Sequence, residues 1–144
     1  MLFIKTLAGA IASMGFAVIF NVRKENLIYA GIVGFISSLT YFVVLDYQLA
    51  SPVMAVFIAS FIVSIVSEIM ARMIKCPTTT FLICAIIPLV PGGKLYYTML
   101  AVINGTIDEA IYLLIGTIAD AGAIVIASAI VGGFVKIFDR LSYK

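Results

Sequence analysis

The stretch Pro88-Leu89-Val90-Pro91-Gly92-Gly93 dictates the fold, because it interrupts an apolar segment of this 144-residue chain. Proline lacks a backbone N–H and clashes with the preceding helical turn, so Pro88 and Pro91, followed by two glycines, end a helix. Broken backbone at membrane depth is tolerated only where protein covers it or where it lines a wet cavity. Two interpretations stay open: a site within a broken membrane span, or a loop at the membrane surface.

The composition of the whole chain is more apolar than that of a water-soluble protein. Hydrophobic residues make up 64% of the sequence, charged residues make up 11%, and the mean hydropathy is +1.24. A soluble domain has about half apolar and about a quarter charged residues. No soluble core hides this much apolar surface, so membrane lipid is the expected surrounding.

The gaps between charged residues mark the expected spans, since a transmembrane helix needs roughly 20 mostly apolar residues. The stretches of suitable length are Thr6–Val22, Asn26–Leu45, Tyr47–Ser67, Cys76–Gly93 and Ala110–Val135. Another stretch, Leu95–Ile107, is short. We expect the first stretch to be a retained helix, because its apolar run continues past the small residues that resemble a signal-peptide cleavage site. We therefore predict an all-α integral membrane protein: a single transmembrane domain over residues 1–144, with about five helices and a Pro/Gly-broken fourth segment.

Basic residues predict the orientation, since cytoplasmic loops are enriched in lysine and arginine. Most of them follow the first, third and last spans: Arg23, Lys24, Arg72, Lys75, Lys136, Arg140 and Lys144. Lys5 and Lys94 then lie on the opposite side, with Lys94 in the loop after the fourth span. We therefore predict a multi-pass protein of the cell (cytoplasmic) membrane with a cytoplasmic C-terminus. A fourth segment that only re-entered the membrane would worsen this charge split.

Several function classes lack their required residues. The chain has no histidine, and Cys76 and Cys84 form neither a Cys-x-x-Cys redox pair nor a zinc set. No phosphate-binding loop, dinucleotide fingerprint or nucleophile elbow occurs. We expect no enzyme activity, no cofactor and no metal. The net charge of +2 comes from loop residues, so we expect no nucleic-acid partner.

An acid lies inside the last span. Asp120 sits among apolar residues, and Gly116 and Gly122 on either side leave room for a neighbouring helix or for water. An ionisable group at such a place is costly and suggests function by default. Three interpretations stay open for Asp120: proton coupling, recognition of a substrate amine, or a structural acid at a helix interface.

A charged pair marks the end of the third span. Glu68 and Arg72 are four residues apart, which places them on one helix face where they can pair. This pair is either an interfacial ion pair or a gate that contacts substrate. Small residues at a spacing of four, such as Ala30 and Gly34, predict tight helix packing.

Four short motifs follow one another along nearly the whole chain. They are GFAVIFNV at 15–22, GIVG at 31–34, SEIMAR at 67–72 with Cys76-Pro77, and IPLVPGG at 87–93 with Leu95-Tyr96. In these motifs the chain resembles the small integral-membrane subunit of the threonine/serine exporter family, and the last motif is the most specific. One departure is Arg23, at a position where relatives often have proline.

The resemblance implies a secondary exporter of small amino acids (threonine, serine) or of dicarboxylates such as succinate. It also implies a larger partner subunit, because chains of this size resemble one half of a split transporter. The pathway residues implied by analogy are Pro88, Pro91, Gly92 and Gly93. Burial alone suggests coupling or binding roles for Glu68 and Asp120. Five helices are few for enclosing a pathway, so a homo-oligomeric transporter stays an alternative, as does a non-transporting assembly factor.

Overall fold

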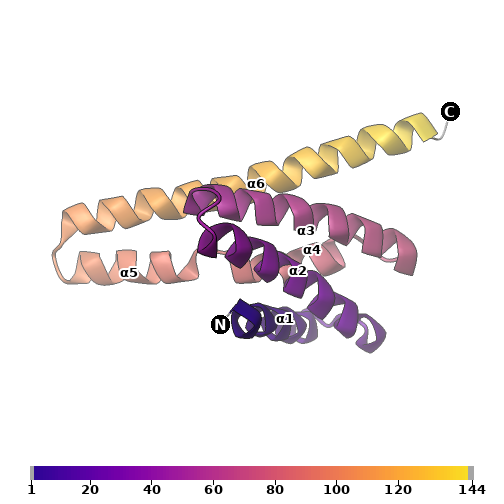
Figure 1. The fold of residues 1–144 in the computed structure, drawn as a ribbon, viewed down its shortest axis with the longest axis horizontal. Coiled ribbons are helices and arrows are strands. Elements are labelled where there is room, and N and C mark those ends of the chain that lie inside the picture. The colour runs from indigo at the N-terminus through magenta and orange to yellow at the C-terminus, as the bar shows by residue number, and fades with distance from the viewer. Residues whose placement is uncertain (1, 143–144) are drawn as a thin grey trace.

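The computed structural model describes residues 2–142, and every regular element in that range is helical. Figure 1 shows the path of the chain. The elements are α1 (Leu2–Ile19), the 3₁₀ turn η1 (Lys24–Asn26), α2 (Leu27–Asp46), α3 (Pro52–Ile74), α4 (Thr79–Ile86), the 3₁₀ turn η2 (Ile87–Leu89), α5 (Gly92–Ile103) and α6 (Ile107–Ser142).

Left-handed residues end four of the helices and allow short connections. Asn21, Gln48 and Lys75 have φ between 51° and 57°, and Gly105 has φ 78°. After each, the next backbone N–H donates to a carbonyl five residues back, as Val22 does to Ala17 at 2.9 Å. This C-terminal cap satisfies carbonyls that a helix end leaves free. Consecutive helices therefore turn back on one another after only a few residues.

The helices have the length and composition of membrane spans. Four of them are long and apolar enough to cross a membrane: α1, α2 with η1, α3 and α6. The segments Thr79–Leu89 and Gly92–Ile103 reach that length only together, and they are bent by 45° at the break between them. The prediction of an all-helical membrane protein with a broken fourth segment is confirmed. The two stretches on either side of the break, predicted separately, are the halves of this bent pair.

Small side chains hold α1 against α2. The hydroxyl of Ser13 lies where a Cβ of Gly34 would stand, and Ser38 occupies the same place opposite Gly9. Ala30, one turn before Gly34, is fully buried. Close approach of backbones through small residues is the usual way in which membrane helices associate. The predicted packing role of the Ala30 and Gly34 pair is therefore confirmed.

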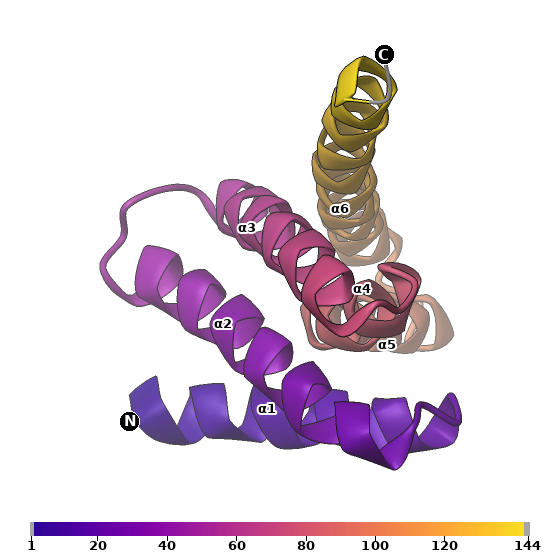
Figure 2. The same ribbon diagram turned by 90° about the vertical axis from the view of Figure 1, so that its right-hand side faces the viewer.

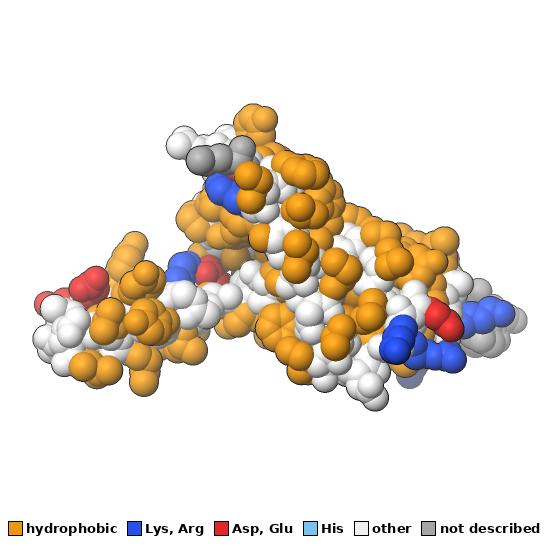
Figure 3. Space-filling model, turned by 90° about the horizontal axis from the view of Figure 1, so that it is seen from below, with side chains coloured by type: hydrophobic (Ala, Val, Ile, Leu, Met, Phe, Trp, Pro, Cys, Tyr) orange, Lys and Arg blue, Asp and Glu red, His pale blue; other side chains and the backbone are white. Residues whose placement is uncertain are grey.

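The molecule has two parts, a bundle and a hairpin. Helices α1 to α4 pack around a core that includes Val33, Val63 and Phe81, and α6 crosses α3 (Figures 1 and 2). Helix α5 packs on the first half of α6, and this α5–α6 hairpin extends past the end of the bundle (Figure 1). Hydrophobic side chains are spread over all parts of the face in Figure 3, and charged side chains lie in only a few places on it, as expected for a surface in contact with lipid.

One end of the bundle carries most of the charged loop residues. The connection between α1 and α2 holds Arg23 and Lys24, and the connection between α3 and α4 holds Lys75. Residues of both connections line one cavity, which shows that the two connections lie close together. We call this part of the molecule the basic end.

Candidate functional site

The Pro-Gly break is a short non-helical step between two half-helices. Pro88 lies in η2, and Pro91, with φ −74° and ψ 50°, stands just before α5. The backbone N–H of Gly92 donates to Val90 O at 2.7 Å, and that of Leu95 donates to Pro91 O at 3.1 Å. No side chain caps the start of α5. The break therefore presents the amino end of a helix whose first-turn N–H groups lack intrahelical partners.

The glycines of the break stand beside open space. Gly92 and Gly93 are the first two residues of α5, and both are exposed. A Cβ built on either would meet no atom within 4 Å. Neither glycine is needed for close packing within the chain. The space beside them is available to lipid, to another subunit or to a small molecule.

An ion pair joins α5 and α6 directly after the break. Lys94 Nζ lies 2.6 Å from Asp120 Oδ2. The Asp120 side chain is 5% exposed, whereas that of Lys94 is 39% exposed. The sequence placed Lys94 in an outer loop, and that prediction was wrong: it occupies the first turn of α5. A base in a helical segment is tolerated because it pairs with the buried acid.

Helix geometry explains why these two side chains meet. Helices α5 and α6 are antiparallel neighbours joined by a tight turn at residues 104–106. Side chains lean toward the amino end of their own helix, so Lys94 leans away from the turn and Asp120 leans toward it. Lys94 lies nine residues before Ile103 and Asp120 lies 13 residues after Ile107. The difference of about 6 Å along the axes is within the reach of a lysine side chain.

The pair leaves hydrogen-bonding capacity unused. Asp120 Oδ1 is buried and has no partner among residues 2–142. Lys94 carries three N–H donors, and within the same range its one side-chain hydrogen bond runs to Asp120 Oδ2. Gly116, one turn before Asp120, lies against the lysine chain, since a Cβ built there would make an ordinary contact with Nζ at 3.8 Å. The arrangement therefore offers one free carboxylate oxygen and free ammonium donors side by side.

Glu68 lies in a separate charged cluster at the basic end. Arg72 Nε donates to Glu68 Oε1 at 2.9 Å, and its Nη2 donates to Asp139 Oδ1 of α6 at 2.8 Å. The second oxygen of Glu68 accepts a hydrogen bond from Thr78 Oγ1 at 2.6 Å. The predicted pairing of Glu68 with Arg72 is confirmed. The cluster ties the end of α3 to the following loop and to α6.

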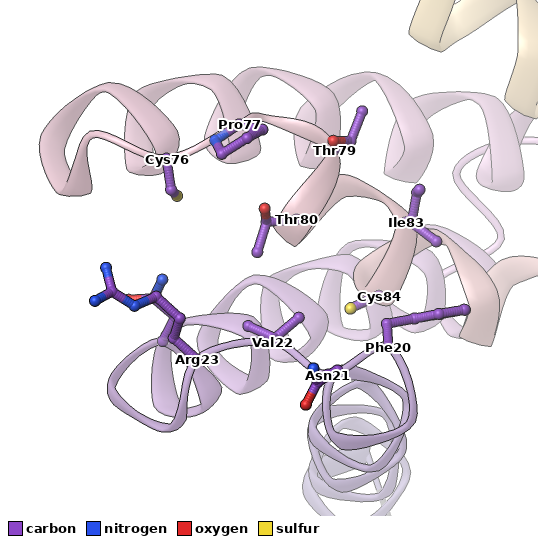
Figure 4. A pocket seen from close by; sticks show the side chains of 11 residues that line it. Phe20, Asn21, Val22, Arg23, Cys76, Pro77, Thr79, Thr80, Ile83 and Cys84 are labelled. Atoms are coloured by element: carbon purple, nitrogen blue, oxygen red, sulfur yellow. The ribbon is translucent and has the colours of Figure 1, made fainter.

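A cavity of about 400 Å³ opens at the basic end, and its lining includes Pro77 and Thr79, the chain neighbours of Thr78 (Figure 4). Its lining comes from the connection between α1 and α2, which includes η1, from the connection between α3 and α4, and from α4. Cys76 and Thr80 are directed into the space, and Arg23 extends at its rim (Figure 4). Burial raises the pKa of the Cys76 thiol. The cavity mixes polar and apolar groups, which suits a vestibule for a small polar solute.

The predicted site residues fall into two groups. The break and Asp120 lie together, joined through Lys94, whereas Glu68 belongs to the cluster at the basic end. Sequence reasoning missed Lys94 because it treated a base after a helix break as a loop residue. A lone buried acid in the next span was the signal that could have found it, since intramembrane charges pair.

Comparison with known proteins identifies a family. Residues 5–133 match the family model described as Threonine/Serine exporter, ThrE. No curated protein and no solved structure gives a significant match. The matched range contains all of α2 to α5, the break and Asp120.

Proposed function

This chain belongs to the threonine/serine exporter family, and we propose that it is one subunit of a secondary exporter that moves threonine, serine or a similar small solute. It is a multi-pass membrane protein and a transporter rather than an enzyme. Its substrate class within that family, its partner and its pathway residues are our proposals.

The observation that carries the proposal is the break with the Lys94–Asp120 pair directly after it. Transporters commonly build their substrate sites from discontinuous helices, whose half-helix ends point at charged groups of the substrate. We therefore place the pathway along Pro88, Pro91, Gly92, Gly93 and Asp120, and add Lys94 to it. A dicarboxylate such as succinate is the second candidate substrate, because Lys94 and the amino end of α5 both favour an anion.

We propose that a larger subunit of the same family completes the pathway. The α5–α6 hairpin supports this, because it extends past the bundle with large apolar side chains exposed on both helices, among them Tyr97, Ile103 and Tyr112. Four or five spans are few for enclosing a route through about 30 Å of hydrocarbon. A homo-oligomer of this chain would meet the same requirement.

We also propose that the basic end faces the cytoplasm. It carries Arg23, Lys24 and Lys75, and the contact of Arg72 with Asp139 brings the C-terminal part of α6 to the same end. Enrichment of basic residues in short cytoplasmic loops supports this orientation. The cavity lined by Cys76 and Thr80 then becomes the entry vestibule for an exported solute. Glu68 accepts a hydrogen bond from Thr78, whose chain neighbours Pro77 and Thr79 line that cavity.

Efflux from proteoliposomes tests the proposal. Vesicles loaded with threonine, serine or succinate are prepared with this chain alone, with a larger family subunit alone, and with both. We expect threonine and serine efflux only when both chains are present. Efflux from this chain alone would establish a homo-oligomeric transporter. Efflux from the larger subunit alone at the same rate would leave this chain as an assembly factor and contradict the proposal.

A further inference from the structure

We propose that Lys94 and Asp120 together form the receptor for the α-carboxylate and α-ammonium groups of one amino acid. This inference rests on the proposed function: within an amino-acid exporter family, it assigns the two charged groups of the substrate to two named side chains. The two side chains lie side by side at the break, 2.6 Å apart, with complementary charges.

Each member of the pair lacks partners that an amino acid would supply. Asp120 Oδ1 is buried without a hydrogen-bond donor, although Asp120 is only 4% exposed. An unpartnered buried oxygen is costly, so a donor that reaches it gains more than an ordinary surface hydrogen bond does. The α-ammonium group is such a donor. Lys94 keeps N–H groups free for the α-carboxylate while it still holds Asp120 Oδ2.

The backbone beside the pair favours the same ligand orientation. Lys94 is the third residue of α5, so its side chain leaves from the first turn of this 12-residue helix. Helix amino ends attract anions, and no side chain caps this one. The open space beside Gly92 and Gly93 lies at the same turn. The carboxylate of the ligand is therefore placed toward α5 and its ammonium toward α6.

Charge complementarity separates amino acids from dicarboxylates. A zwitterion brings one group of each sign to a site that holds one group of each sign. Succinate would satisfy Lys94 with one carboxylate and bring the other close to the Asp120 carboxylate. Like charges in a partly desolvated site repel strongly. The site therefore selects against a second carboxylate.

Competition by truncated analogues of threonine tests this assignment. Counterflow of labelled threonine is measured in vesicles that contain this chain with its larger subunit. The competitors are serine, 3-hydroxybutyrate (which lacks the ammonium group), 1-aminopropan-2-ol (which lacks the carboxylate) and succinate. We expect only serine to compete in the wild type. In Asp120→Asn the affinity for threonine should fall at least about tenfold, the effect of losing one charge-assisted hydrogen bond, and 3-hydroxybutyrate should approach threonine as a competitor.

Matched variants separate recognition from structure. Lys94→Met should lose the discrimination between threonine and 1-aminopropan-2-ol. The exposed pair Lys5–Asp46, with a separation of 3.3 Å, provides the control, and Lys5→Met should leave the competition profile unchanged. The double variant K94D/D120K keeps both charges for folding but places a short acid on α5. We expect it to insert normally and to transport poorly.

The outcomes distinguish this inference from the proposed function. Failure of the wild-type complex to move threonine or serine at all would overturn the proposed function and this assignment with it. Threonine counterflow with an unchanged competition profile in Asp120→Asn and Lys94→Met would overturn the assignment alone. Full transport by K94D/D120K would also overturn it, because it would show that the pair only ties α5 to α6.

Discussion

Replacing Gly34 by alanine should separate α1 from α2 and destabilise the whole bundle. A methyl group at this position would overlap the Cβ and Oγ of Ser13 and would stand 3.3 Å from the carbonyl oxygen of Gly9. The obstructing atoms belong to a short side chain and to backbone, so neither can swing away. The helices must move apart, and the small-residue contact between them is lost.

The magnitude follows from two opposing effects. Overpacking of a close contact costs about 1–3 kcal/mol. Alanine in place of glycine inside a helix gains about 1 kcal/mol through helix propensity. Gly34→Ala should therefore lose up to about 2 kcal/mol in net stability, and should be about 1–3 kcal/mol less stable than a variant that has the propensity gain alone. Gly122→Ala is the matched control, since its methyl group meets nothing within 4 Å and only the propensity gain remains.

A thiol-reactive fluorophore can measure this difference during thermal unfolding in detergent. Cys84 is buried in the core next to α1 and α2, so its exposure reports opening of the bundle. In a Cys76→Ser background, Gly34→Ala should lower Tm by up to about 8 °C and Gly122→Ala should not lower it. Adding Ser13→Gly to Gly34→Ala should restore most of the loss. A Gly34→Ala protein as stable as the Gly122→Ala control would refute this account of the α1–α2 contact.

Three further outcomes are expected. Pro91→Ala should reduce threonine efflux while membrane insertion stays normal, because it restores the missing N–H at the break. Pro52→Ala, at the first turn of α3, is the control, and equal efflux from both variants would contradict a pathway role for Pro91. Arg72→Met should change Tm little, since its side chain is 51% exposed and water screens its ion pairs. A large loss of Tm would show that this cluster governs folding. Burial raises the pKa of the Cys76 thiol. Maleimide labelling of this thiol at neutral pH should therefore be slower in the folded protein than in the unfolded chain, and should accelerate as pH rises. Equal labelling rates in the two states would argue against the buried environment.

Local chemistry made much of the fold predictable. Apolar runs of membrane length mark the helices, and proline followed by glycine marks the break whatever surrounds it. The pairing of Glu68 with Arg72 was predictable as well, because a spacing of four places both on one helix face. In each case the relevant partners lie within one segment of the chain.

Contacts between distant segments were not predictable in the same way. Lys94 and Asp120 are 26 residues apart, and their meeting depends on the register of the α5–α6 hairpin. The contact of Arg72 with Asp139, 67 residues apart, depends on the crossing of α3 by α6. Counting the lysine and arginine residues on each side of the membrane also gave a wrong position for Lys94. That count assigns every lysine to a loop and takes no account of a lysine that pairs with an acid inside a helical segment.

Helix α6 is one unbroken helix of 36 residues, and it contributes an acid to both charged clusters. Asp120 and Asp139 are 19 residues apart, or about 28 Å along the axis. If α6 turns as a rigid rod, a rotation that pulls Asp120 away from Lys94 also turns Asp139 away from Arg72. The two ion pairs are then broken or kept together. One of them can break alone only if α6 bends between them, and Gly122, Gly132 and Gly133 are the residues there at which the helix backbone is most easily bent.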